Sequence, residues 1–190
     1  DIDTSFSESG HKEIAIDLSA SNIALVEHNS GSLFIVGSKS KTDGEEGFVA
    51  KVDQSGNLDT SFATDGIYTT SVSGAELVNL TGIALDNSGN ILPVGSIVIS
   101  GTPKLIALKL SSNGTEIFKY VGQETTDTDN KIVQILTDTT GKLYLIANLI
   151  DSPNKANVIR LLVTGTLDTS FAANGVGEYT LASTGNTELS

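Results

Sequence analysis

The sequence contains no cysteine, and this absence excludes several kinds of chemistry together. Without thiols the chain can form no disulfide, no thiolate metal site and no cysteine nucleophile. Methionine and tryptophan are also absent, and only four tyrosines and six phenylalanines supply aromatic rings. Because sugar-binding sites usually stack a sugar on an exposed aromatic ring, this scarcity disfavours a lectin.

Positive charge is also scarce. Eleven basic residues, among which Arg160 is the single arginine, stand against 23 acidic residues, and the formal net charge is -12 at pH 7. A protein that binds nucleic acid needs basic residues to neutralise phosphates, so we expect no nucleic-acid partner. No apolar run approaches the roughly 18 residues of a membrane helix, so we expect no membrane insertion. Cations such as calcium, or basic surfaces, are electrostatically easier partners.

The remaining composition is that of a globular protein. Hydrophobic residues make up 38% of the chain and charged residues 18%, with 19 glycines and three prolines, which excludes disordered and collagen-like chains. A surface supplied largely by Ser, Thr, Asn and Gly favours an exported bacterial protein, and we expect an extracellular or cell-surface location. The chain begins with Asp1 and no signal peptide, so we expect a mature or excised piece.

A four-residue signature, Asp-Thr-Ser-Phe, occurs three times, at residues 3–6, 59–62 and 168–171, each time after Ile or Leu. The intervals are 56 and 109 residues, and a degenerate copy at residues 112–118 keeps the turn and an aromatic residue. A regular interval of this length indicates a repeat architecture.

Predicted hairpins recur in phase with the signature. Apolar runs flank a glycine-containing turn in residues 23–38, 83–96 and 133–147, and a further apolar run follows each hairpin. No segment shows a sustained helical period. Each unit therefore reads as four short strands, and we expect the first strand of each unit to follow the signature, over residues 12–17, 66–72, 117–122 and 175–182.

These patterns predict an all-β fold of β-propeller-like blades, each with four antiparallel strands: three complete repeats plus the first strand of a fourth. The predicted units are residues 1–57, 58–115, 116–166, which has the degenerate start, and 167–190, which holds the start of a fourth repeat and a polar tail.

The signature context Gly-x-Leu-Asp-Thr-Ser-Phe, with a turn of the form Asp-x-x-Gly-x-Ile/Leu-x-x-Val-Gly, resembles the delta-60 repeat, a propeller-type repeat of bacterial surface and exported proteins. The resemblance covers essentially the whole chain. It departs from the family pattern at the degenerate signature of residues 112–118, and in having only three complete units plus the opening strand of a fourth. It implies a β-propeller outside the cell and carries no catalytic residues over.

We assign the signature residues a structural role. Asp3, Asp59 and Asp168 are expected to accept backbone N–H groups in a turn, as aspartates often do. Phe6, Phe62 and Phe171 are expected to be buried between blades as large apolar anchors.

The sequence offers few candidate metal-binding or catalytic residues. The acidic loop 124–130 offers Asp127 and Asp129 as a candidate calcium site, with a solvated loop tip as the alternative, and no other cofactor is expected. The two histidines, His11 and His28, stand in no catalytic or zinc motif. We therefore expect a protein that is not an enzyme.

Three blades cannot complete a propeller ring, which needs about four to eight. We expect self-association, into a closed ring or a filament, or docking onto the remainder of a larger propeller. The leading function is a binding or structural scaffold with a surface protein or polysaccharide as ligand. The alternatives are a self-assembling subunit of an extracellular fibre or layer, and a hydrolase with a carboxylate site at the channel mouth.

Overall fold

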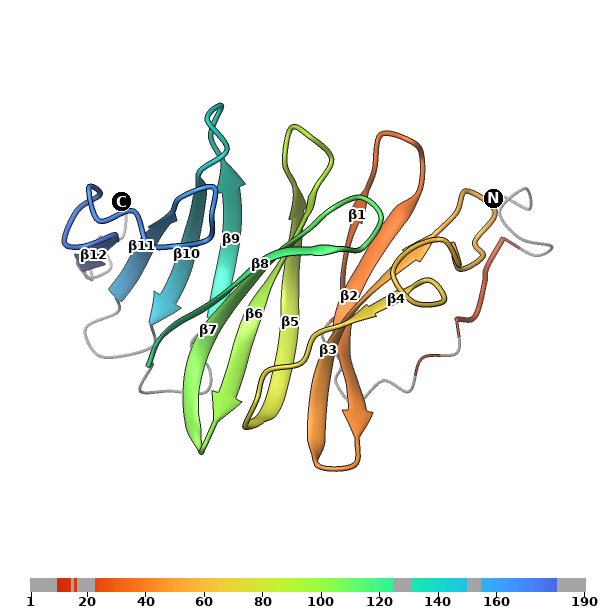
Figure 1. The fold of residues 1–190 in the computed structure, drawn as a ribbon, viewed down its shortest axis with the longest axis horizontal. Coiled ribbons are helices and arrows are strands. Elements are labelled where there is room, and N and C mark those ends of the chain that lie inside the picture. The colour runs from red at the N-terminus through yellow and green to blue at the C-terminus, as the bar shows by residue number, and fades with distance from the viewer. Residues whose placement is uncertain (1–9, 15, 17–22, 125–130, 150–154, 181–190) are drawn as a thin grey trace, which may run out of the picture.

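The computed structural model describes residues 10–14, 16, 23–124, 131–149 and 155–180. Within this part of the chain the structure is all-β, with twelve strands and no helix. The strands form three sheets of four antiparallel strands each, which lie in a row and do not close into a barrel (Figure 1). The predicted all-β class and the four-stranded antiparallel units are confirmed.

Within each sheet, strands that are consecutive in the chain pair with one another, so each sheet is a simple meander. The first sheet contains β1 (Ala24–Glu27), β2 (Leu33–Lys41), β3 (Gly44–Val52) and β4 (Ile67–Thr69). The second contains β5 (Ala75–Leu85), β6 (Ile91–Ile99), β7 (Thr102–Leu110) and β8 (Glu116–Glu124). The third contains β9 (Lys131–Thr137), β10 (Leu143–Leu149), β11 (Lys155–Leu161) and β12 (Val176–Thr180).

The turn between the first two strands has one construction in all three sheets. The turn glycines, Gly31, Gly89 and Gly141, have φ values of 77°, 75° and 83°, which favour glycine. Each glycine N–H donates to the carbonyl of the residue three positions earlier, over 2.8 to 3.0 Å. These turns give three equivalent reference points from which positions in the sheets can be counted.

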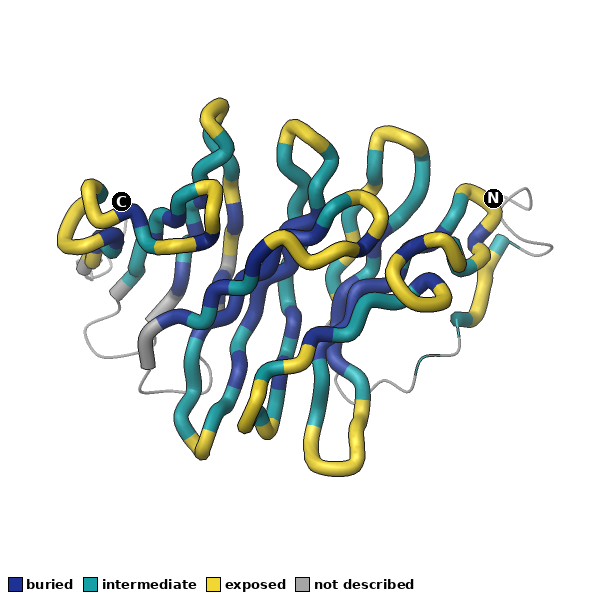
Figure 2. The backbone as a smooth tube through the Cα atoms, in the orientation of Figure 1, coloured by how far each residue is buried: buried dark blue, intermediate teal, exposed yellow. Residues whose placement is uncertain are grey.

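Two hydrophobic cores hold the sheets together, and both include residues of the second sheet (Figure 2). Phe34 of β2 lies in a core that also contains Leu80 of the second sheet. Leu92 of β6 lies in the other core with Leu145 of the third sheet. Since successive residues of a strand face opposite sides, the second sheet is buried on both faces, and each outer sheet packs on it with one face.

The strand after each signature lies elsewhere than the sequence predicts. Ile67 of β4 pairs with Ala50 of β3, so this strand closes its own sheet instead of opening the next one. Val176 of β12 likewise pairs with Ile159 of β11, and the predicted first strand of a fourth repeat is therefore wrong. The expected strand over residues 12–17 is not present in the part of it that the structure describes.

A local reversal of the chain explains this difference. After the signature loop, Gly66 returns to the strand that the chain has just left, where its carbonyl accepts from N–H of Lys51 over 3.0 Å. The three sheets consequently span residues 24–69, 75–124 and 131–180, and unit boundaries drawn at the signature cut each sheet before its last strand.

The described part of the chain holds no helix with the length and hydropathy of a membrane span.

Candidate functional site

The signature loops of the first and third sheets have the same backbone conformation. Ala63 and Ala172 have φ values of 47° and 45°, and Asp65 and Asn174 have values of 52° and 54°. In both loops the signature Phe N–H donates to the signature Asp carbonyl over 2.9 Å. Because non-glycine residues rarely adopt positive φ, the two loops share an unusual geometry immediately after their signatures.

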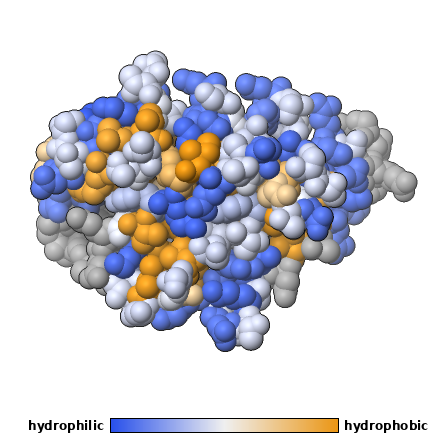
Figure 3. All heavy atoms as spheres, viewed as in Figure 1, coloured by the Kyte–Doolittle hydropathy of each residue, from blue (hydrophilic) through white to orange (hydrophobic). Residues whose placement is uncertain are grey.

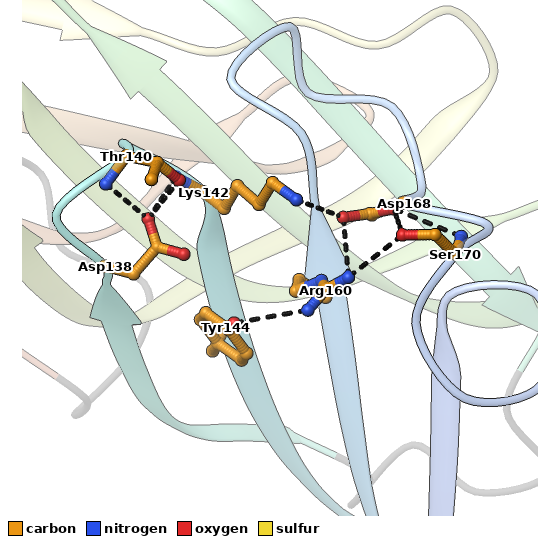
Figure 4. Close-up of polar contacts among 7 residues, drawn as sticks. All are labelled: Asp138, Thr140, Lys142, Tyr144, Arg160, Asp168 and Ser170. Carbon is orange, nitrogen blue, oxygen red and sulfur yellow. Dashed lines mark hydrogen bonds and ion pairs between the residues drawn. The ribbon is translucent and has the colours of Figure 1, made fainter.

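Asp168 is the centre of a polar cluster in the third sheet (Figure 4). Its Oδ2 accepts from Nζ of Lys142 over 2.8 Å and from Nη2 of Arg160 over 2.9 Å. Its Oδ1 accepts from the backbone N–H and the hydroxyl of Ser170 over 3.1 and 2.6 Å. Asp168 is 4% exposed, and the hydrogen bond from Lys142 holds the pKa of its carboxyl well below the ordinary value. A carboxylate so fully occupied is a fixed structural anion.

Aromatic rings complete the cluster around Arg160. The guanidinium carbon lies 4.6 Å from the ring centroid of Phe171, within the range of a cation–π contact. The Tyr144 ring meets Phe171 edge to face with centroids 6.0 Å apart, and Nη1 of Arg160 lies 3.4 Å from the Tyr144 hydroxyl. Arg160 is therefore held by charge and by ring contacts together.

The first sheet repeats this arrangement with different side chains. Nζ of Lys51 lies 2.8 Å from Oδ2 of Asp59, and Oδ1 of Asp59 accepts from the N–H and hydroxyl of Ser61 over 3.1 and 2.5 Å. The hydrogen bond from Lys51 lowers the pKa of Asp59 to about 2. Phe62 is completely buried and packs against Phe34 with ring centroids 5.5 Å apart.

The second sheet has lost the signature loop. After the turn at Gly114 the chain enters β8 at once, and Ile117 stands where Asp59 and Asp168 follow their turn glycines. Lys109 pairs instead with Asp86, whose Oδ2 lies 2.8 Å from Nζ. Phe118 of the degenerate signature packs in the core between the second and third sheets, so an aromatic anchor is kept.

The signature regions of the first and second sheets each contact a turn of the next sheet. The N–H of Ala63 donates to the carbonyl of Asn113 over 2.9 Å, and a Cβ on Gly114 would lie 2.6 Å from Cβ of Ala63. A Cβ on Gly165 would lie 2.4 Å from the Phe118 ring. The glycines of these turns therefore allow close contact between neighbouring sheets.

In the third sheet the same positions have no neighbouring sheet within the described part of the chain. Tyr144 and Ile146 stand where Phe34 and Val36 stand in the first sheet, counted from the turn glycines, and alternate with the buried residues Leu143 and Leu145. On the same face Leu136 and Tyr179 are 51% and 52% exposed. We call this surface the open face of the third sheet. Figure 3 shows apolar atoms at the surface over the second and third sheets.

A polar hollow of about 200 Å³ lies between the hairpin turns of the second and third sheets. It is lined from one side by Asp86 and Ser88 and from the other by Asp138 and Thr139. Burial opposes ionisation of Asp86, but hydrogen bonds from Lys109 and the turn lower its pKa below the ordinary value. The hydrogen bond from Thr140 is the main cause of a lowered pKa for Asp138. Both carboxyls are therefore ionised at neutral pH.

Several predicted residues lie outside the described part of the chain. These are the first signature, with Asp3 and Phe6, and the candidate calcium ligands Asp127 and Asp129. Within the described residues, no group of three or more His, Asp or Glu side chains is placed to hold a metal ion. Nδ1 of His28 is engaged with Ser30 in a hairpin turn.

Sequence reasoning missed the basic partners of the signature aspartates. Lys51 and Arg160 each stand eight residues before the signature Asp that they pair with. This constant spacing is a signal in the sequence, and it becomes readable only when the loop is known to return to the preceding strand.

Comparison of the sequence with models of protein families gives no match, and no curated protein is similar to it. The likeness to the delta-60 repeat therefore rests on the signature and turn residues of this chain alone.

Proposed function

We propose that this chain is a non-enzymatic repeat module of an exported or cell-surface protein, and that its three sheets are consecutive blades of a β-propeller that serves as a binding or structural scaffold. The observation that carries the proposal is the use of the signature carboxylates. Asp59 and Asp168 are each occupied by a basic side chain and by a Ser two residues on, so the repeated polar residues stabilise loops.

The way the sheets stack supports a propeller. Residues three and five positions after the turn glycine face the next sheet in the first sheet (Phe34, Val36) and in the second (Leu92, Val94). The same side of one sheet thus meets the opposite side of the next. This head-to-tail packing is heterologous, and heterologous contacts generate rings or open filaments.

A hydrolase is the least supported alternative. Among the described residues, Asp86 and Asp138 line one hollow, but Asp86 is paired with Lys109 and the pKa of both carboxyls is lowered, so neither is a proton donor at neutral pH. General acid–base catalysis by a carboxyl pair requires two acidic groups with separated pKa values near one substrate.

A self-assembling subunit is the second candidate, and the open face of the third sheet favours it. Phe171 is only half-buried there, and Ala172 donates no hydrogen bond of the kind that Ala63 makes to the next turn among the described residues. Exposed apolar patches of this kind often mark interaction surfaces.

Light scattering across a wide range of protein concentration tests both candidates. A discrete closed assembly is the expected result for a propeller scaffold, whereas growth without limit supports the fibre subunit. Val158 lies on the open face opposite Ile146, so Val158→Lys should reduce the mass, whereas Thr164→Lys, at an exposed turn, should not. A monomer at all concentrations, unaffected by Val158→Lys, would contradict self-association through this face.

A further inference from the structure

The hollow between the hairpin turns of the second and third sheets is a product of one sequence difference. In the first sheet the equivalent turn begins with His28, and in the second sheet it begins with Asp86. A Cβ on Gly89 would lie 2.9 Å from Nε2 of His28, so the imidazole occupies the space beside the glycine of the next turn. Its ring is also fixed edge to face on Phe34, with centroids 5.9 Å apart.

The same space is open one sheet further along. Asp86 is shorter than His28 and turns toward Lys109, 2.8 Å away. Beside Gly141, the residue equivalent to Gly89, only a Cγ atom of Val163 comes within 4 Å of an added Cβ among the described residues. A volume of about 200 Å³ is therefore left open here, whereas the His28 imidazole fills the equivalent space between the first and second sheets.

One carboxylate of the lining, Asp138, forms no ion pair with a lysine or arginine among the described residues, although the charge of Lys142 contributes to lowering its pKa. Asp86 and Lys109 neutralise each other. Oδ1 of Asp138 accepts from the N–H and hydroxyl of Thr140 over 2.8 and 2.7 Å, and its Oδ2 accepts no hydrogen bond from the described residues. The ammonium group of Lys142 is directed to Asp168 instead.

We infer that this hollow binds the basic side chain of a protein partner, an arginine or a lysine. A free carboxylate oxygen and the hydroxyls of Ser88 and Thr139 offer acceptors to a group with several N–H donors. The equivalent place already holds a nitrogen-bearing ring from this chain, His28. This inference names a ligand class for the scaffold proposed above and rests on that proposal.

Other ligand classes fit the lining less well. An anion would meet two carboxylates, at Asp86 and Asp138, and the one lysine of the lining, Lys109, is already paired with Asp86. A sugar would find no aromatic ring among the lining residues. A calcium ion takes six to eight oxygen ligands, usually with several carboxylates, and a single carboxylate without an ion-pair partner is a poor start for such a site.

An NMR titration of the full chain tests the inference, with Nα-acetyl-arginine methylamide as the probe and methyl glucoside as the neutral comparison. The expected result is a saturable shift of amide signals in residues 86–88 and 138–141 with the arginine probe alone. Asp138→Asn keeps the turn hydrogen bonds at Oδ1 and removes the charge, so it should weaken binding by about tenfold or more. Thr139→Phe should block the hollow without touching the Asp138 hydrogen bonds.

Asp53→Asn is the matched control, because Oδ1 of Asp53 caps a turn in the same way, with N–H groups of Ser55 and Asn57 at 2.9 and 2.8 Å. Binding should be unchanged in this variant. Equal affinity in Asp138→Asn, shifts caused by the glucoside, or no saturable shift in the folded chain would each overturn the inference. The scaffold proposal would survive such a result, since the solution mass tests it separately.

Discussion

Nζ of Lys109 lies 2.8 Å from Oδ2 of Asp86, and this ion pair replaces the one that the signature provides in the other two sheets. Lys109 stands five residues before its turn glycine, as Lys51 and Arg160 do, but the second sheet has Ile117 in place of the signature Asp. The basic residue is kept, and a carboxylate from the hairpin turn takes over as its partner.

Removing this carboxylate should destabilise the fold. Asp86→Asn can retain the turn hydrogen bonds at Oδ1 but leaves Lys109, which is 9% exposed, without a counter-charge. We expect the free energy of unfolding to fall by about 1 to 3 kcal/mol in urea denaturation. Asp53→Asn, in a turn capped in the same way at 2.9 and 2.8 Å, should have a smaller effect. Equal losses in the two variants would contradict the importance of the ion pair.

The two described signature phenylalanines should contribute unequally to the free energy of unfolding. Phe62 is completely buried between the first and second sheets, so Phe62→Ala should lower the free energy of unfolding by about 3 to 5 kcal/mol. Phe171 is only half-buried, and Phe171→Ala should have a clearly smaller effect. Chemical denaturation of the two variants measures the difference, and a larger loss from Phe171→Ala would show that another unit covers it in solution.

The Asp59 ion pair predicts a specific pH dependence of stability. The hydrogen bond from Lys51 lowers the pKa of Asp59 from 3.8 to about 2 in the folded protein. A depressed pKa favours the fold while the group is ionised, so its contribution is complete above about pH 4 and is lost as the pH falls toward 2. In thermal melts from pH 5 to 2, the difference in melting temperature between the wild type and Asp59→Asn should therefore become smaller as the pH falls. A difference in melting temperature that stays constant over this range would contradict a stabilising contribution from ionised Asp59.

Gly114 should matter through its contact with the first sheet. Both Gly114 and Gly101 have positive φ, 86° and 73°, so alanine at either position carries backbone strain of about 1 to 2 kcal/mol. Only at Gly114 would the new Cβ meet another residue, 2.6 Å from Cβ of Ala63, whereas nothing lies within 4 Å at Gly101. Gly114→Ala should thus lower the melting temperature further than Gly101→Ala. Equal melting temperatures of the two variants would mean that the contact between Gly114 and Ala63 can rearrange at no cost in stability.

Much of the local structure could be predicted from the sequence. The hairpins around Gly31, Gly89 and Gly141 were predictable because alternating apolar residues and positive-φ glycines act over a few residues. The assignment of the strand after the signature was wrong, since its partner is chosen by the return of the loop at Gly66 and Gly175, which no periodicity records.

The candidate site was harder to predict than the strands. The signature residues Asp59 and Asp168 were singled out, but their partners Lys51 and Arg160 were not, because each lies on the preceding strand and not in the motif. The polar hollow was also missed, since it depends on the length of one side chain at position 86 and on the direction in which that side chain turns.

By itself, the sequence determined the all-β class, the repeated four-stranded unit and the glycine turns, because these depend on residue spacing and backbone conformation along one segment. Only the tertiary structure decided which sheet receives the strand after the signature, which charges pair and which apolar face is exposed among the described residues. Those outcomes depend on atoms from segments far apart in the chain, such as Ala63 against Gly114, and arise only when the sheets pack together.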